Sequence, residues 1–318
     1  MEVAPGIHRI QTPFGDRFVC LYLLVGSEAA LLVDTGVDAT PGEYVAPYLD
    51  EIGLAADKIR YVINSHADFD HVAGNGAVKD MTPGALFLCH LLDMEMVGHV
   101  DRLIEDRLAA REEDHGIVTT EAAKEETRAA SRHVPVDIAL SGGERVRLGA
   151  DWEVEILHTP GHSRGHLTVY DARSQSLIIA DAALFNAVLN ADGSPAFPPT
   201  YRFVNSYVSS IDRLLGIPAS GLYTSHYPIY RGAGIAEFLH ESRSYVDRVD
   251  QSLETYLGAH GPTTLLELCD GLGRVLGEWP EESNPALTFP LLGHLERMVG
   301  YGRAVTGRRE GLITYEMR

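Results

Sequence analysis

The stretch "NSHADFDHVAGN", residues 64–75, places two histidines and two aspartates within six positions. The apolar segment 59–64 leads directly into this cluster and has the composition of a buried strand. The cluster therefore belongs to a loop at a strand end, where binding and catalytic side chains are common. Because imidazole nitrogens and carboxylate oxygens bind divalent metals, the stretch predicts a metal site.

Other strand ends carry side chains of the same kinds. The segment "HTPGHSRGH", residues 158–166, follows the predicted strand 153–157, while Asp181 and His226 stand at the ends of two later strands. Two metal ions about 3.5–4 Å apart can share one water and hold a substrate oxyanion. The groups that could hold such a pair, with Asp181 between the ions, are His66, Asp68, Asp70, His71, His162, Asp181 and His226.

The order of elements predicts layered α/β packing. Residues 18–34 form two apolar strands around a turn at 26–28, and residues 41–52 have helical spacing of apolar side chains. The strands 59–64 and 85–89 follow, so that strands and helices alternate. Further strands are predicted at residues 137–140, 145–148, 153–157, 167–171 and 176–180. Residues 190–200 are predicted to form a loop because of their Gly and Pro content.

Two segments depart from this alternation. Residues 91–132 are predicted to form one or two amphipathic helices whose charge run is a solvated face, with a substrate lid as the alternative. After about residue 236, three helices precede two strands, which is the order of a winged helix. We therefore expect a catalytic domain at 1–240, with the helical insertion at 91–132, and a winged-helix-like domain at 241–318.

Composition limits the classes of function. The 318 residues carry a formal net charge of −19, which disfavours contact with a phosphate backbone. The segment 241–318 is itself acidic, with eight arginines against twelve acidic residues, so nucleic acid is not expected as a partner, whereas a homodimer stays open. No apolar run reaches the roughly 20 residues of a membrane helix. The three scattered cysteines are expected to be reduced and buried, and the protein to be cytoplasmic without a membrane partner.

These motifs resemble those of the metallo-beta-lactamase superfamily. Its His-x-His-x-Asp-His motif is matched by "HADFDH" at 66–71, and its Pro-Gly-His-[Ser/Thr]-x-Gly-His motif by "PGHSRGH" at 160–166. Asp181 matches the bridging aspartate of the family and His226 its last histidine. The four motifs stand in the family's order within residues 7–235, which makes the resemblance specific.

The resemblance implies a fold and a site. The fold is the four-layer αββα sandwich, an α/β architecture. The implied ligands are His66, Asp68 and His162 for one metal and Asp70, His71 and His226 for the other, with Asp181 bridging. Asp70 would also orient the attacking hydroxide. His166 is expected to be a structural hydrogen-bonding residue, and Asp34 to fix a loop or to support the ligands.

Asp68 departs from the family pattern, in which a histidine stands at this position. A carboxylate is a harder ligand and adds a negative charge, and oxygen-rich sites favour iron or manganese. The related flavodiiron proteins have a glutamate there and bind iron. We therefore expect two divalent metal ions, with zinc as the first choice and iron or manganese as the alternatives.

The expected activity is hydrolysis of a small-molecule ester, thioester, lactone or phosphodiester by a metal-bound hydroxide. Three alternatives stay open. One is an iron-dependent redox enzyme on the same scaffold, another is an RNA-processing nuclease that uses the C-terminal domain, and the third is a binding protein whose altered site no longer turns over.

Overall fold

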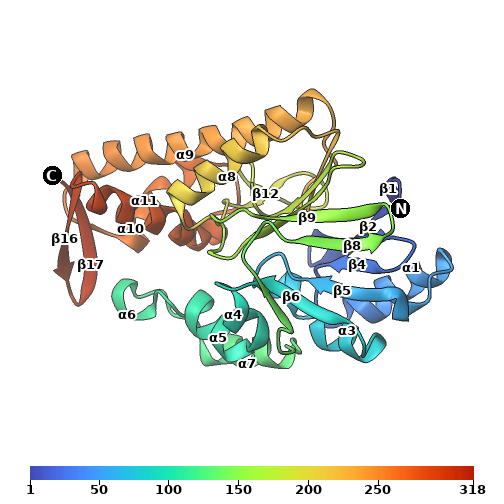
Figure 1. Ribbon diagram of the computed structural model, residues 1–318. Coiled ribbons are helices and arrows are strands. Elements are labelled where there is room, and N and C mark those ends of the chain that lie inside the picture. The colour runs from blue at the N-terminus through green and yellow to red at the C-terminus, as the bar shows by residue number, and fades with distance from the viewer.

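The computed structural model describes residues 1–318 and contains two sheets that pack face to face (Figure 1). The seven-stranded sheet consists, in spatial order, of β1 (Glu2–Ala4), β2 (Ile7–Phe14), β3 (Arg17–Val25), β4 (Ala30–Val33), β5 (Ile59–Ile63), β6 (Leu86–His90) and β7 (Ile138–Leu140). The five-stranded sheet consists of β14 (Gly221–Thr224), β11 (Ser176–Ala180), β10 (Leu167–Asp171), β9 (Trp152–His158) and β8 (Arg145–Gly149).

Alternation along the strands explains the layers. In β3, Tyr22 and Leu24 belong to the core between the two sheets, whereas Leu21 and Leu23 belong to the core on the outer face of the first sheet. Successive side chains of a strand point to opposite faces, so a continuous apolar run predicts a sheet that is covered on both sides. The αββα sandwich expected from the sequence is therefore confirmed.

Helices cover the outer face of each sheet. The first sheet packs against η1 (Pro41–Val45), α1 (Ala46–Glu51) and α3 (Asn75–Met81), whose buried Val45, Leu49 and Val78 belong to the core on its outer face. Two further short helices, η2 (Ala56–Lys58) and α2 (Phe69–Val72), stand before and after β5 in the chain. The outer face of the second sheet packs against α8 (Val204–Leu215) and α9 (Ala233–His260). Both helices bury apolar side chains at helical spacing, for example Tyr207, Ile211 and Leu214 of α8.

The segment 91–132 is helical, but its form differs from the one or two amphipathic helices expected. It contains five short helical pieces: α4 (Met94–Gly98), α5 (Val100–Leu103), η3 (Ile104–Leu108), α6 (Glu112–His115) and α7 (Glu121–Ala129). The helical segment is interrupted at His99, whose backbone is extended, and at Gly116, whose backbone is left-handed with φ at 68°. Residues 190–200, expected as a loop, include part of a small hairpin of β12 (Val188–Leu189) and β13 (Pro195–Phe197).

The C-terminal segment contains the expected helices and hairpin. They are β15 (Thr263–Thr264), α10 (Leu265–Leu276), η4 (Glu281–Leu287), α11 (Thr288–Gly300), β16 (Ala304–Arg309) and β17 (Leu312–Met317). The expected boundary at 240/241 falls within the unbroken helix α9, and both the division into domains and the winged-helix assignment stay predictions. No helix of the chain has both the length and the apolar character needed to cross a membrane.

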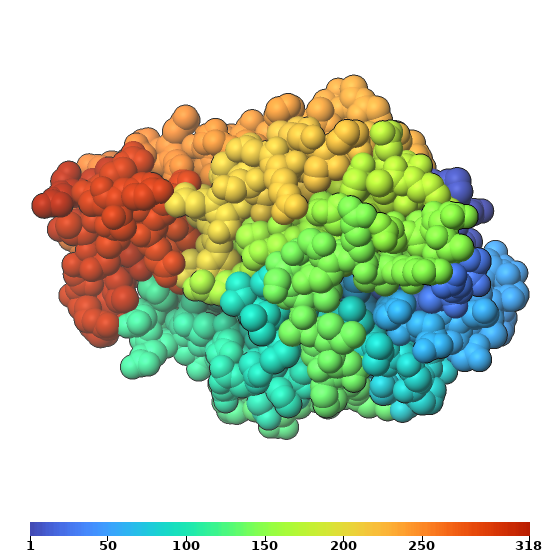
Figure 2. Space-filling model, in the orientation of Figure 1, coloured from blue at the N-terminus to red at the C-terminus, as the bar shows by residue number.

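The insertion and the C-terminal hairpin lie side by side (Figure 2). Arg308 of β16 donates a hydrogen bond to Asp114 of α6 at 2.7 Å, and the His115 ring stacks on Tyr315 of β17. The insertion is thereby held between the N-terminal sheet and the C-terminal segment. This arrangement brings residues of both the insertion and α11 to the edge of the site described next.

Candidate metal centre

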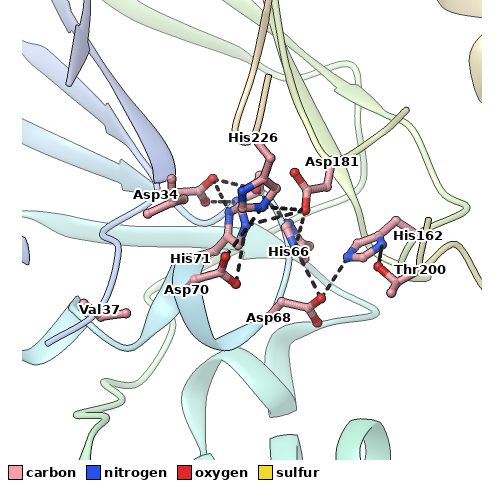
Figure 3. Close-up of polar contacts among 12 residues, drawn as sticks. Asp34, Val37, His66, Asp68, Asp70, His71, His162, Asp181, Thr200 and His226 are labelled. Carbon is pink, nitrogen blue, oxygen red and sulfur yellow. Dashed lines mark hydrogen bonds and ion pairs between the residues drawn. The ribbon is translucent and has the colours of Figure 1, made fainter. Parts of the chain in front are cut away.

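The predicted ligands come together at one edge of the two sheets (Figure 3). β4 pairs with β5 in parallel, and β11 pairs with β14 in parallel, so the carboxyl ends within each pair lie together. The segment after β5 carries the 66–71 cluster, with His66 and Asp68 in the loop and Asp70 and His71 in α2, while Asp181 follows β11 and His226 follows β14. His162 lies in the turn between β9 and β10. Strand ends therefore position all seven side chains.

The ligand atoms form three overlapping groups, in each of which all atoms lie within 4.8 Å of one another. The groups are His66, His71 and Asp181; His66, Asp68 and His162; and Asp70, His71 and His226. Asp181 Oδ2 lies 3.8 Å from His66 Nε2 and 3.3 Å from His226 Nε2. The shared members connect the three groups into a single cluster.

Several of these atoms are buried and have no hydrogen-bond partner. They are Nε2 of His66, Nε2 of His71 and Oδ1 of Asp181. A buried polar atom without a partner is costly, and such atoms are rare in folded proteins. The two Nε2 atoms lie 3.8 and 3.7 Å from Oδ2 of the same Asp181 carboxylate, and imidazole with carboxylate is the donor set of divalent metals. The residues therefore fit bound metal ions.

Neighbouring side chains orient the ligands. The Nδ1 atom of His226 donates to the Phe18 carbonyl oxygen at 2.9 Å, which leaves Nε2 as the nitrogen with a free lone pair. The backbone N–H of Asp181 donates to Nε2 of His166 at 3.2 Å. His166 is fully buried and also hydrogen bonds Thr159, so its predicted structural role is confirmed.

Asp34 is the main support of the 66–71 loop. Its carboxylate accepts hydrogen bonds from the backbone N–H of Ser65 at 2.7 Å and from Nδ1 of His71 at 2.9 Å. Burial lowers the pKa of His71, but the surrounding carboxylates, Asp34 first, raise this pKa to about 10. The site is thus an anionic environment in which a cation is favoured. Asp34 therefore fixes the loop through Ser65 and contacts His71, and its support of a metal ligand stays a prediction.

Replacement of Asp34 by asparagine should weaken metal binding without unfolding the chain. Asp34 has a left-handed backbone, with φ at 63°, which asparagine tolerates. The amide offers only one acceptor oxygen, so Ser65 and His71 lose part of their support. We expect metal affinity to fall by roughly 10- to 100-fold. Competition with a fluorescent chelator measures the affinity, and an unchanged affinity would show that Asp34 supports the loop only.

Arg107 is a residue of the site that the sequence did not reveal. Its guanidinium donates to both carboxylate oxygens of Asp68, at 2.7 and 2.8 Å, and its Nη2 lies 3.1 Å from Nε2 of His162. Arg107 and His162 hold the pKa of Asp68 well below its usual range although burial raises it. The sequence does contain a signal that this arginine faces the protein interior. Residues three and four apart share one face of a helix, so Arg107 lies on the same face as Ile104 and Leu103.

A cavity of about 180 Å³ opens beside the cluster. Asp70, Asp181 and His226 line it, and so do Arg107 of the insertion and Phe289 of α11. A reacting group can therefore approach the cluster from this side. The wall comes from segments far apart in the sequence, so its composition depends on tertiary packing.

Known proteins share these features. A family model described as the metallo-beta-lactamase superfamily matches residues 15–226. The acyl-coenzyme A thioesterase MBLAC2 of Bos taurus is 26% identical over 249 residues, which is 71% of this chain and 78% of the relative. The hydroxyacylglutathione hydrolase of Pseudomonas paraeruginosa is 30% identical over 218 residues, which is 67% of this chain and 62% of the relative.

The fold comparison extends over the whole chain. The crystal structure of the metallo-beta-lactamase family protein TTHA1429 from Thermus thermophilus covers 100% of both chains, with a TM-score of 0.76 and 24% identity. This similarity concerns the fold, including the C-terminal segment. Because the family model spans strands β3 to β14 and every predicted ligand, the chain belongs to the metallo-beta-lactamase superfamily and is a hydrolase of that group.

Proposed function

We propose that the protein is a binuclear metal-dependent hydrolase that cleaves the acyl bond of a small thioester or ester. The observation that carries the proposal is the convergence of the buried, unpartnered Nε2 atoms of His66 and His71 on the Asp181 carboxylate, beside an open cavity. Such atoms are costly unless a cation completes them. A purely structural cluster would pair them within the protein.

Each proposed ion has its own set of ligands. One ion would be held by His66, Asp68 and His162, the other by Asp70, His71 and His226, and Asp181 would be shared between them. When bound, the ions would polarise the scissile carbonyl and lower the pKa of a water molecule toward neutrality. Zinc is the proposed metal, with iron or manganese as alternatives because Asp68 supplies an oxygen.

The chain's own residues position the reactants. The side chain of Asp70 is 13% exposed and lines the cavity, so its carboxylate can accept a proton from a water molecule there. Phe289 and Val188 form apolar parts of the wall and exclude bulk water from the reacting bond. Thr200 also lines the cavity and contacts Nδ1 of His162 at 3.5 Å.

The relatives narrow the substrate class. One is named as an acyl-coenzyme A thioesterase and another as a hydroxyacylglutathione hydrolase. Both names describe hydrolysis of an acyl compound rather than cleavage of a nucleic acid. Acyl substrates are therefore preferred to phosphodiesters in the proposal, and the acyl group itself is left to experiment.

The test is a substrate panel with protein stripped of metal by a chelator and reloaded with zinc, manganese or iron(II). We expect release of thiol from pentanoyl N-acetylcysteamine thioester only with the reloaded protein. Metal content should approach two ions per chain. Hydrolysis that persists in the stripped protein would contradict the proposal. Absence of acyl hydrolysis with every metal would also contradict it, and oxygen consumption with iron would then favour the redox alternative.

A further inference from the structure

A second cavity adjoins the one at the metal centre. Its volume is about 350 Å³, and Arg107 and Phe289 line both cavities. The remaining wall comes from the insertion, from the turn after β9, from the residues before α8 and from α11. A molecule whose reacting bond lies at the metal centre could extend past Arg107 and Phe289 into this second space.

The second cavity is rich in positive charge, although the chain carries a net charge of −19. Four arginines line it: Arg107, Arg111, Arg164 and Arg202. Two of them are neutralised within the protein, because Arg107 pairs with Asp68 and Arg202 pairs with Glu296. The one acidic residue in the wall, Asp106, pairs with Arg102. Arg111 and Arg164 therefore leave an excess of positive charge.

Arg111 is the most informative of these residues. Its side chain makes no hydrogen bond and no ion pair, and its Nε atom is buried without a partner, although only 7% of the residue is exposed. The guanidinium lies 3.8 Å from the ring centroid of Phe289, which also contacts Arg107 at 4.6 Å. Burial and the neighbouring guanidiniums lower the pKa of Arg111 to about 10, so the group is still charged at neutral pH.

A buried cation without a counter-ion destabilises a fold, since its desolvation is not offset by an ion pair. Stacking on Phe289 compensates in part, because a cation over an aromatic ring contributes about 0.5–2 kcal/mol. The ring holds the guanidinium face, so the N–H groups at its edge stay available. Planar N–H pairs of this kind are suited to bind a carboxylate or a phosphate.

We propose that this second cavity binds an oxyanionic group of the substrate, a carboxylate or a phosphate, with Arg111 as its counter-ion. The inference rests on the proposed function, because it places the acyl bond at the metal centre and the anion beyond Arg107 and Phe289. The substrate class is then an acyl ester or thioester that carries a negative charge away from the bond to be cleaved.

The first test compares substrates of equal length with and without the charge. Glutaryl and pentanoyl N-acetylcysteamine thioesters place a carboxylate on the acyl side, and pentanoyl 4′-phosphopantetheine and pentanoyl pantetheine place a phosphate on the thiol side. Hydrogen bonds to charged groups predict a preference of roughly 10- to 100-fold in kcat/KM for one anionic substrate over its neutral partner. The substrate pair that shows the preference identifies whether the bound anion is a carboxylate on the acyl side or a phosphate on the thiol side.

The Arg111→Met variant should lose this preference, mainly through a higher KM for the anionic substrate, and keep its rate on the neutral one. The matched control is Arg128→Met in the same insertion, where the arginine is 35% exposed and already paired with Asp101 and Glu125, none of which lines the cavity. This control should keep the preference. Equal rates on charged and neutral substrates in the parent protein, or an unchanged preference in Arg111→Met, would overturn the inference.

A second measurement separates this inference from the proposed function. In the absence of ligand, Arg111→Met should melt at the same or a higher temperature than the parent, because an unpaired buried charge has been removed. Glutarate or inorganic phosphate should raise the melting temperature of the parent but not of the variant. A melting temperature that falls in Arg111→Met would assign the arginine a structural role. If neither the charged nor the neutral thioesters are hydrolysed but the anion still stabilises the parent, the proposed function fails and the anion site stands.

Discussion

Replacement of Asp181 by alanine is expected to abolish the binding of at least one metal ion and to lower the hydrolytic rate by about 10³-fold or more. The Oδ2 atom of Asp181 lies 3.8 Å from Nε2 of His66 and 3.7 Å from Nε2 of His71. The variant therefore leaves the imidazoles without the anion they share. A metal-held oxyanion contributes several kcal/mol to the transition state, and each 1.36 kcal/mol corresponds to a factor of ten.

The fold should survive this replacement. The backbone N–H of Asp181, rather than its side chain, donates to His166, so the loop after β11 keeps its anchor. Elemental analysis after dialysis measures the ions per chain, and thiol release from a thioester measures the rate. The matched control is Asp212→Ala on the exposed side of α8. Two ions per chain in Asp181→Ala, with an unchanged rate, would refute the bridging role.

The sheets could be predicted because their strands are apolar on both faces. β10 and β11 occupy the predicted ranges 167–171 and 176–180, since a polar turn separates two short apolar runs. β2 was missed, because "IHRIQTPF" includes charged and polar residues and a proline. Its Arg9 is nonetheless buried, where it donates to Cys20 Sγ and to the Tyr227 carbonyl oxygen, and only tertiary packing provides those partners.

The ligand types could be predicted for a related reason. Each stands in the segment that follows an apolar strand, and for all of them except His162 that strand has a parallel neighbour, so that the carboxyl ends meet at one edge. The approach of the insertion to this edge has no such local signal. Its sequence predicts helices with a solvated charged face, but Arg107 and Arg111 turn toward the site and Phe289 of α11 meets them there. Such contacts between distant segments do not follow from periodicity.

Asp68→Ala is the second replacement with a large expected effect, and it should act on stability and on metal content together. The Arg107 side chain is 9% exposed and would lose its carboxylate partner, which costs about 3–5 kcal/mol for a buried pair. Because the Asp68 side chain is 25% exposed, water can reach the remaining charge, and we expect about 3 kcal/mol. One of the two proposed ions should also be lost, since Asp68 is one of its three terminal ligands.

A double variant separates the two effects. In Asp68→Ala/Arg107→Met no unpaired buried charge remains, so most of the free energy of unfolding should return. The metal content should stay at one ion per chain, because the ligand is still missing. Denaturant unfolding of the metal-free proteins measures the first quantity, and elemental analysis measures the second. Parental metal content in both variants would mean that Asp68 serves only as the partner of Arg107.

The single variant Arg107→Met completes a double-mutant cycle with Asp68→Ala and the double variant. It shows how the arginine and a metal ion compete for the Asp68 carboxylate. Arg107 Nη2 lies 2.8 Å from Asp68 Oδ2 and 3.1 Å from His162 Nε2, which are both proposed ligand atoms of the same ion. The guanidinium repels a nearby cation and occupies the carboxylate that would bind it. Its removal should therefore tighten the first ion, measured by chelator competition, while the second ion is unaffected. If affinity instead falls, Arg107 acts chiefly by holding Asp68 in place, and the charge competition is outweighed by the loss of that orientation.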